Sequence, residues 1–280
     1  MKAVRCGAQK QAWRSSRGVC PKDGVELVAF SLPTFPPPSP LKKVIVHCAA
    51  ERCPDISERD HAATIRLNVK ATEHLAKAAV ARGALLMYIS SDYLFDGSQP
   101  PYEIDAKPNP LNFYGKCKYE AELAVRAIDP SAIVIRIPLL YGAVEYNAEA
   151  TVNVLADFIL NKEKSITVDN WQIRYLTNVA DVAKIIRILV DENIVSNRLQ
   201  VGVFHFSAKE RFTKYAMCAV IAKAMGQDMS HIVPHSDPPK EPVASRPADA
   251  QLATTRLEQA GLYFPCVGFE DWFAANAPAS

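Results

Sequence analysis

Three apolar, β-branched runs set the strongest constraint on the fold of this chain. They are residues 44–50, 84–89 and 132–137 of the 280-residue sequence. Continuous apolar runs of this length are typical of strands that are covered on both faces, as in a parallel sheet. Helical patterns separate the runs. Residues 55–58 resemble a capping box in which Asp55 caps a helix that runs to about Arg82, with a break near Asn68 and an end at Gly83. A second helix ends at Asp129-Pro130. The alternation predicts βαβ units with right-handed crossovers around one parallel sheet.

The second half of the chain alternates less regularly. Its patterns predict helices at 151–161, 178–192, 213–225 and 254–260, and strands at 165–168 and 203–206. Residues 234–247 are rich in proline and are expected to be irregular.

Residues 1–40 differ in character from the chain that follows Leu41. The first 22 residues contain six basic and no acidic side chains, and five prolines lie between Pro33 and Pro40. Proline cannot continue a helix or a central strand, so residues 25–30 are the candidate for a short strand here. We expect a disordered or alternative amino-terminal segment. Its basic start also resembles an organelle transit peptide.

The composition excludes several classes of protein. The formal net charge is +2, which gives no reason to expect nucleic acid or an anionic membrane as a partner. No apolar run approaches the roughly 20 residues that span a bilayer. The seven cysteines are scattered and form no Cys-x-x-Cys pair. This pattern fits a reducing compartment and predicts no metal site.

The second apolar run ends in hydroxyl side chains, and the next helix adds a tyrosine and a lysine. Ser91 lies at the carboxyl end of the predicted strand, and Asn112 can cap a helix of residues 113–128. Tyr114 and Lys118 lie four residues apart on that helix. Lys118 shares its face with apolar residues, so we expect it to point inward and to lower the pKa of Tyr114. The alternative is an ordinary helix whose lysine reaches solvent.

The motifs of this stretch resemble those of the extended short-chain dehydrogenase/reductase superfamily. They are similar to the branch that contains bacterial dTDP-4-dehydrorhamnose reductases and the animal regulatory β subunits of methionine adenosyltransferase. Both groups share the motifs at residues 91–97, 114–118 and 246–247. The segments that favour the β subunits are residues 44–55, 136–142, 212–215 and 250–252. Sugar reductases usually carry Asn-Ala-Ala-Ala-Tyr-Thr where this chain has His-Cys-Ala-Ala-Glu-Arg. The resemblance covers residues 41–265.

The resemblance implies an α/β fold: a Rossmann-like, doubly wound parallel sheet with a smaller C-terminal subdomain of the substrate-binding type. It implies a core of residues 41–142 and 172–206, and a smaller subdomain of residues 143–171 and 207–280. It further implies an NADP site lined by Cys48, Ala49, Ala50, Arg52, Tyr114, Lys118 and Leu140. Ser91, Tyr114 and Lys118 would occupy the catalytic positions.

The chain departs from the family pattern at both ends. The family begins with a strand and a Gly-rich turn that lets a pyrophosphate approach a helix amino terminus. Residues 1–40 contain only Gly7, Gly18 and Gly24, which are spaced too widely for that turn. We therefore expect a sheet without its first β-α-β unit. The longer tail by which β subunits are expected to join their catalytic subunit has no counterpart after residue 273.

Three functions remain open at this point. The first is a non-catalytic regulatory subunit that binds the catalytic subunit of methionine adenosyltransferase and tunes S-adenosylmethionine synthesis. The second is an NADP(H)-dependent reductase of a nucleotide-linked 4-keto-6-deoxysugar. In it, Tyr114 would donate the proton, Lys118 would lower its pKa and Ser91 would orient the carbonyl. The third is a degenerate binding module. The missing turn and the β-subunit segments favour the first, located in the cytoplasm, with mitochondria as the alternative.

Overall fold

The central sheet has four parallel strands, in the order β10-β5-β4-β3. The computed structural model describes residues 15–19, 26–30, 43–240 and 243–276. The strands are β3 (Val44–His47), β4 (Leu85–Ser91), β5 (Ile133–Ile137) and β10 (Gly202–His205). Every residue of β5 is buried, as expected for a strand that is covered on both faces. The three apolar runs of the sequence therefore form neighbouring strands of one parallel sheet, as predicted.

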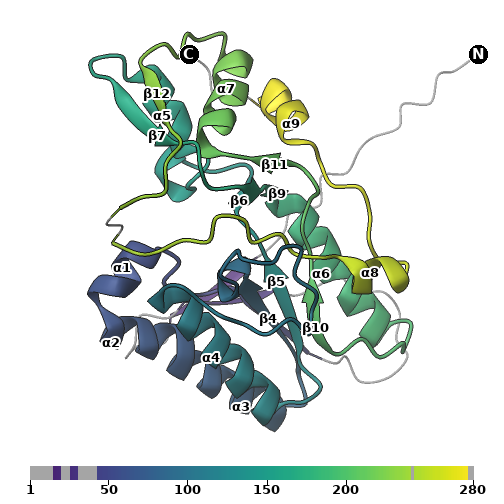
Figure 1. Ribbon diagram of the computed structural model, residues 1–280. Helices are drawn as coiled ribbons and strands as arrows, with labels where there is room; N and C mark the ends of the chain where they lie inside the picture. Colours follow the sequence, from purple (N-terminus) through teal and green to yellow (C-terminus); the bar gives the residue numbers. More distant parts are fainter. Residues whose placement is uncertain (1–14, 20–25, 31–42, 241–242, 277–280) are drawn as a thin grey trace, which may run out of the picture.

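Helices cover both faces of this sheet (Figure 1). On one face lie α3 (Ala71–Ala81) and α4 (Phe113–Ile128), and on the other lies α6 (Val179–Ile194). The side chains of β4 alternate between the two cores. Leu86 and Tyr88 pack in the cluster that includes Ala76 and Ala121, whereas Met87 packs in the cluster that includes Ile185. This arrangement confirms the coarser part of the predicted fold class, which is an α/β fold with a parallel sheet.

The connection from β3 to β4 is more broken than predicted. It consists of α1 (Pro54–Arg59), α2 (His61–Thr64), the π-helical turn η1 (Ile65–Lys70) and α3. The prediction that Asp55 caps this helix is wrong, because α1 begins at Pro54 and has no side-chain cap. Asp60 is the cap instead, since its carboxylate accepts the N–H of Ala63 at 2.9 Å and starts α2. The break expected near Asn68 is confirmed by the π-helical turn.

A second group of elements lies at the top of Figure 1, and its members come both before and after β10 in the chain. Its main elements are α5 (Val154–Leu160), β7 (Ile166–Asp169), α7 (Lys214–Met225), β12 (Ile232–His235) and α9 (Phe269–Asn276). Its core includes Ile159, Ile221, Phe269 and Phe273. The prediction that residues 234–247 are wholly irregular is wrong, because Pro234 and His235 pair with β7. This strand escapes the proline rule because β7 is its only partner in the described sheet.

The remaining elements are short. They are the strands β6 (Leu140–Tyr141), β8 (Arg174–Tyr175), β9 (Thr177–Asn178) and β11 (Arg211–Phe212), the 3-10 turns η2 (Asp92–Leu94) and η3 (Asn147–Glu149), and the helix α8 (Thr255–Gln259). β6 pairs with β9, and β11 pairs with β8.

At the amino terminus, β1 (Ser15–Val19) and β2 (Glu26–Phe30) form an antiparallel pair. The strand expected at 25–30 is thereby confirmed, whereas β1 was not predicted and lies within the segment expected to be disordered. Residues 1–14, 20–25 and 31–42 of that segment lie outside the described residues. No helix in the described part of the chain has the length and apolar character needed to cross a bilayer.

Candidate functional site

The carboxyl end of β4 and the amino end of α4 are held together by the first turn of α4. Asn112 caps this helix, because its Oδ1 accepts the N–H of Gly115 at 2.8 Å. The carboxylate of Glu58 accepts the N–H of Phe113 at 2.7 Å. Gly115 lies so close to η2 that a Cβ on it would be 2.2 Å from the carbonyl oxygen of Tyr93. These contacts fix the helix start against the strand end.

The structure brings the side chains of Ser91 and Tyr114 together at this junction. The Ser91 hydroxyl donates to Asp92 Oδ1 at 3.1 Å and accepts the N–H of Tyr93 at 3.1 Å. Burial raises the pKa of Tyr114, and its interaction with the Ser91 hydroxyl opposes that rise. Burial also raises the pKa of Asp92 to about 6, although the charge of Arg174 opposes it. Both groups therefore hold their protons more tightly than they would in water.

Lys118 points inward, as its position on the helix predicted, with 4% of its surface exposed. Its amino group donates to the carbonyl oxygen of Ile89 at 2.6 Å and lies 4.2 Å from the ring centroid of Tyr88. Burial lowers the pKa of Lys118 to about 8, while the charges of Glu122 and Cys48 oppose this. The expected lowering of the Tyr114 pKa is not found. Desolvation dominates there and raises the pKa of Tyr114 instead.

The predicted cofactor residues at the end of β3 lie on one loop. Ala49 and Ala50 are half-buried, whereas Cys48 and Arg52 are exposed. Desolvation raises the pKa of the Cys48 thiol, and the charge of Lys118 opposes it, so Cys48 lies within electrostatic reach of Lys118. Leu140 is half-buried in β6, beside Thr177 of β9.

The sequence did not reveal the residue that holds this loop. Asn68 is buried in the π-helical turn. Its side chain accepts the N–H of Glu51 at 2.7 Å and donates to the Glu51 carbonyl at 3.0 Å. The carbonyl of Asn68 accepts the Thr72 hydroxyl, which also bonds to His47 Nε2 at 2.8 Å. An asparagine inside a helical pattern was the available signal, because its side chain competes with the helix for backbone partners.

A buried ion pair anchors α4 to the sheet behind the site. Arg136 of β5 and Glu122 of α4 are 3% and 1% exposed, with 2.8 Å between Nη2 and Oε2. Arg136 Nη1 also lies 3.2 Å from His205 Nε2. Burial and the charge of Arg136 together lower the pKa of His205 to about 3, so this histidine is neutral at pH 7. The pair was not predicted, because the two residues lie 14 positions apart and on different elements.

The residues present fit one half of a dinucleotide. The hydroxyls of Ser91 and Tyr114 lie together at the end of β4, and groups of this kind would suit the polar edge of a ribose. Two buried hydroxyls nearby, those of Tyr88 and Ser90, have no hydrogen-bond partner in the described residues. The pyrophosphate half is not matched, because no Gly-rich turn opens a helix in the described part of the chain.

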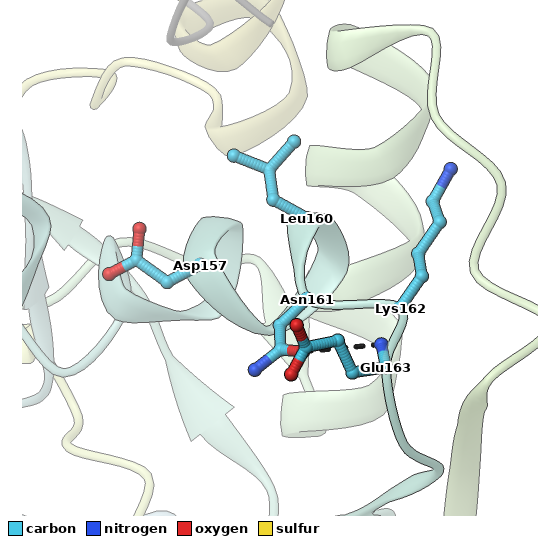
Figure 2. Close-up of a pocket in the computed structure, with 5 residues that line it drawn as sticks. All are labelled: Asp157, Leu160, Asn161, Lys162 and Glu163. Atoms are coloured by element: carbon cyan, nitrogen blue, oxygen red, sulfur yellow. Dashed lines mark hydrogen bonds between the residues drawn. The ribbon is translucent and has the colours of Figure 1, made fainter.

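A separate hollow lies at the carboxyl end of α5, away from these residues (Figure 2). Asp157, Leu160, Asn161, Lys162 and Glu163 line it. The N–H of Glu163 donates to Asn161 Oδ1 at 3.3 Å. The hollow is open and has a lining of one short surface turn, so it lacks the converging side chains of a ligand site.

The site and the parallel sheet define a Rossmann-like α/β protein of the short-chain dehydrogenase/reductase type. The model of the RmlD substrate binding domain matches residues 39–269, so the chain belongs to that family. A crystal structure of dTDP-4-dehydrorhamnose reductase from Bacillus anthracis, in complex with NADP, superposes with a TM-score of 0.73. It is 25% identical and covers 83% of this chain and 79% of that one.

More similar relatives are proteins named methionine adenosyltransferase 2 subunit beta, which confirms the resemblance expected from the motifs. The protein from Bos taurus is 47% identical over 219 residues, which are 78% of this chain and 65% of that protein. The protein from Danio rerio is 44% identical over 228 residues, which are 81% of this chain and 70% of that protein. The chain thus spans 65% of the length of the bovine relative.

Proposed function

We propose that this chain is a non-catalytic regulatory subunit of methionine adenosyltransferase, which binds the catalytic subunit and modulates S-adenosylmethionine synthesis. The observation that carries the proposal is the 47% identity with the bovine subunit beta over 219 residues, against 25% with the Bacillus anthracis reductase. A cytoplasmic location and the division into a core and a smaller C-terminal subdomain belong to the same proposal.

The chemistry of the site supports binding over proton transfer. A tyrosine that donates a proton near neutral pH needs a lowered pKa, but burial raises the pKa of Tyr114. The amino group that would lower it is bonded to the Ile89 carbonyl at 2.6 Å. Ser91, Tyr114 and Lys118 therefore serve, in this proposal, as the wall of a binding site.

The proposed ligand of this binding site is NADP(H). Tyr114 and Lys118 would face the ribose, and Cys48, Ala49, Ala50, Arg52 and Leu140 would line the remainder. When bound, the cofactor could supply a hydride, but nothing in a regulatory role requires it to do so. No Gly-rich turn opens a helix in the described residues, so we expect weaker binding of NADP(H) than in a family member that carries this turn.

The reductase remains the second candidate, because Ser91 and Tyr114 do meet at the end of β4. In that case Ser91 would orient the substrate carbonyl and Tyr114 would protonate it. Lys118 would have to leave the Ile89 carbonyl or act through its charge alone.

The regulatory proposal is tested with the purified chain and a methionine adenosyltransferase catalytic subunit. We expect co-elution at micromolar concentration and a change in the initial rate of S-adenosylmethionine formation. The bovine subunit beta is the positive control. Failure to co-elute, together with unchanged rates, would reject the proposal.

The reductase is tested by NADPH oxidation with dTDP-4-keto-6-deoxyglucose. Tyr114→Phe removes the candidate proton donor, and Tyr146→Phe is the matched control, because Tyr146 is 62% exposed. Turnover that is lost in the first variant and kept in the second would establish the reductase. We expect no turnover in either variant or in the wild-type chain.

A further inference from the structure

The segment of residues 243–249, here called the strap, passes beside the candidate site. In Figure 1, the yellow-green segment that leads into α8 crosses the molecule from beside α1 toward α8. The strap is bonded to the residue that precedes β8, because the N–H of Ile173 donates to the carbonyl of Ala248 at 2.7 Å. It belongs to the C-terminal part of the chain, and besides its contacts with β8 it contacts elements around Tyr114.

The first of these contacts reaches the start of α4. Asn112 is 1% exposed, and its side chain makes two different bonds. Its Oδ1 accepts the N–H of Gly115 at 2.8 Å, which caps α4. Its Nδ2 donates to the carbonyl of Ser245 at 2.7 Å. One buried amide thus joins the strap to the turn that carries Tyr114.

Two more contacts fix the strap on either side of that turn. Arg246 pairs with Asp55 of α1, with 2.7 Å between Nη2 and Oδ2. Gly97, which follows η2, lies against the strap backbone, where a Cβ would be 2.9 Å from the nitrogen of Ala248. Arg246 also interacts with Tyr93, whose ring packs edge-on against Tyr114 at 5.9 Å between centroids.

We propose that the strap positions the first turn of α4, and Tyr114 with it, with Asn112 as the joint and Arg246 as the anchor. Tyr114 lies two residues after the joint, and Tyr93 fills the space between it and the anchor. A displacement of the strap therefore changes the placement of Tyr114, and a ligand held by Tyr114 favours the docked strap. Asn112 and Arg246 are positioning residues in this account. Only the expected effect of the strap on NADP binding rests on the proposed function.

Two variants separate positioning from simple helix capping. Asn112→Asp keeps an oxygen acceptor for Gly115 and loses the donor to Ser245, so the cap stays and the joint is broken. Arg246→Ala removes the anchor without altering any residue of α4. Arg187→Ala is the matched control, because it breaks the Arg187–Asp191 pair (2.6 Å) on the exposed face of α6.

The test is amide hydrogen exchange of the full chain, followed by mass spectrometry of peptides that cover residues 113–118. We expect exchange there to be about fivefold faster in Asn112→Asp and in Arg246→Ala, comparable to the loss of one capping interaction. Arg187→Ala should leave it unchanged. Unchanged exchange in both strap variants overturns the proposal.

A titration with NADP, followed by tryptophan fluorescence, separates this inference from the proposed function. If the wild-type chain binds NADP, both strap variants should weaken the affinity about fivefold, and equal affinities overturn the positioning role. If the wild-type chain does not bind NADP, the cofactor proposal fails. The exchange measurement then still decides whether the strap positions α4.

Discussion

The charge of Lys118 provides the sharpest test of how this site is built. Burial lowers the pKa of Lys118 from 10.5 to about 8, and each pKa unit corresponds to about 1.4 kcal/mol. Burying the charged lysine therefore costs the folded chain about 3 kcal/mol at pH 7. Between pH 8 and pH 10.5 the folded chain releases this proton, whereas the unfolded chain keeps it. The contribution of Lys118 to stability must then rise with pH.

The variant Lys118→Met removes this titration. From pH 7 to pH 10, the free energy of unfolding of the wild-type chain should therefore increase by about 2 to 3 kcal/mol relative to that of Lys118→Met. The variant also loses the hydrogen bond to the Ile89 carbonyl, and this loss changes its free energy of unfolding by the same amount at every pH. Urea unfolding at pH 7 and pH 10 measures the free energy of unfolding of both proteins. Lys184→Met is the control, because Lys184 is exposed and its amino group lies over an aromatic ring, 3.9 Å from the centroid of Phe264. A difference between wild type and Lys118→Met that does not vary with pH would refute the reasoning.

Three further predictions concern the surroundings of the site. Glu122→Gln leaves Arg136 buried without its counter-charge and should lower the free energy of urea unfolding by about 3–5 kcal/mol; a loss below 1 kcal/mol would contradict this. Gly115→Ala forces a methyl group onto the carbonyl of Tyr93 and should cost about 1–3 kcal/mol, visible as a lower Tm. Asp92 has a pKa of about 6, above its usual 3.8, so its stabilising contribution is present below pH 3.8 and is lost as the pH rises from there through 6. Between pH 4 and pH 8, Asp92→Asn should therefore gain about 2 kcal/mol over wild type in urea unfolding, and parallel pH profiles would exclude the shift.

The central sheet could be predicted because its signals are local. Each apolar run is long enough to form a strand by itself, and Asn112 and Asp129-Pro130 set the ends of α4 within the sequence. The inward direction of Lys118 followed from the spacing of its helix face. For the same reason the meeting of Ser91 with Tyr114 could be expected once both elements were assigned.

Contacts between distant segments could not be predicted in this way. Three such contacts join segments whose separation in the sequence has no helical or strand periodicity. They are the Arg136–Glu122 ion pair, the hydrogen bonds of Asn68 with Glu51, and the hydrogen bond of Asn112 with Ser245. The pKa of Tyr114 depends on how much water its surroundings exclude, which a charge pattern alone does not show. α9 was missed because an eight-residue helix carries too few turns for a clear pattern.

The order of strands in the sheet has a consequence for how the chain assembles. β3, β4 and β5 are consecutive along the chain and adjacent in the sheet, and α3 and α4 fall between them. During synthesis, β3, β4 and β5 therefore leave the ribosome before β10 is made. β10 then pairs with the free edge of β5 and completes the described four-stranded sheet. We expect residues 43–137 to collapse first during synthesis, with the edge of β5 unprotected until β10 is added. That interval is when the nascent chain is most exposed to pairing with a wrong strand.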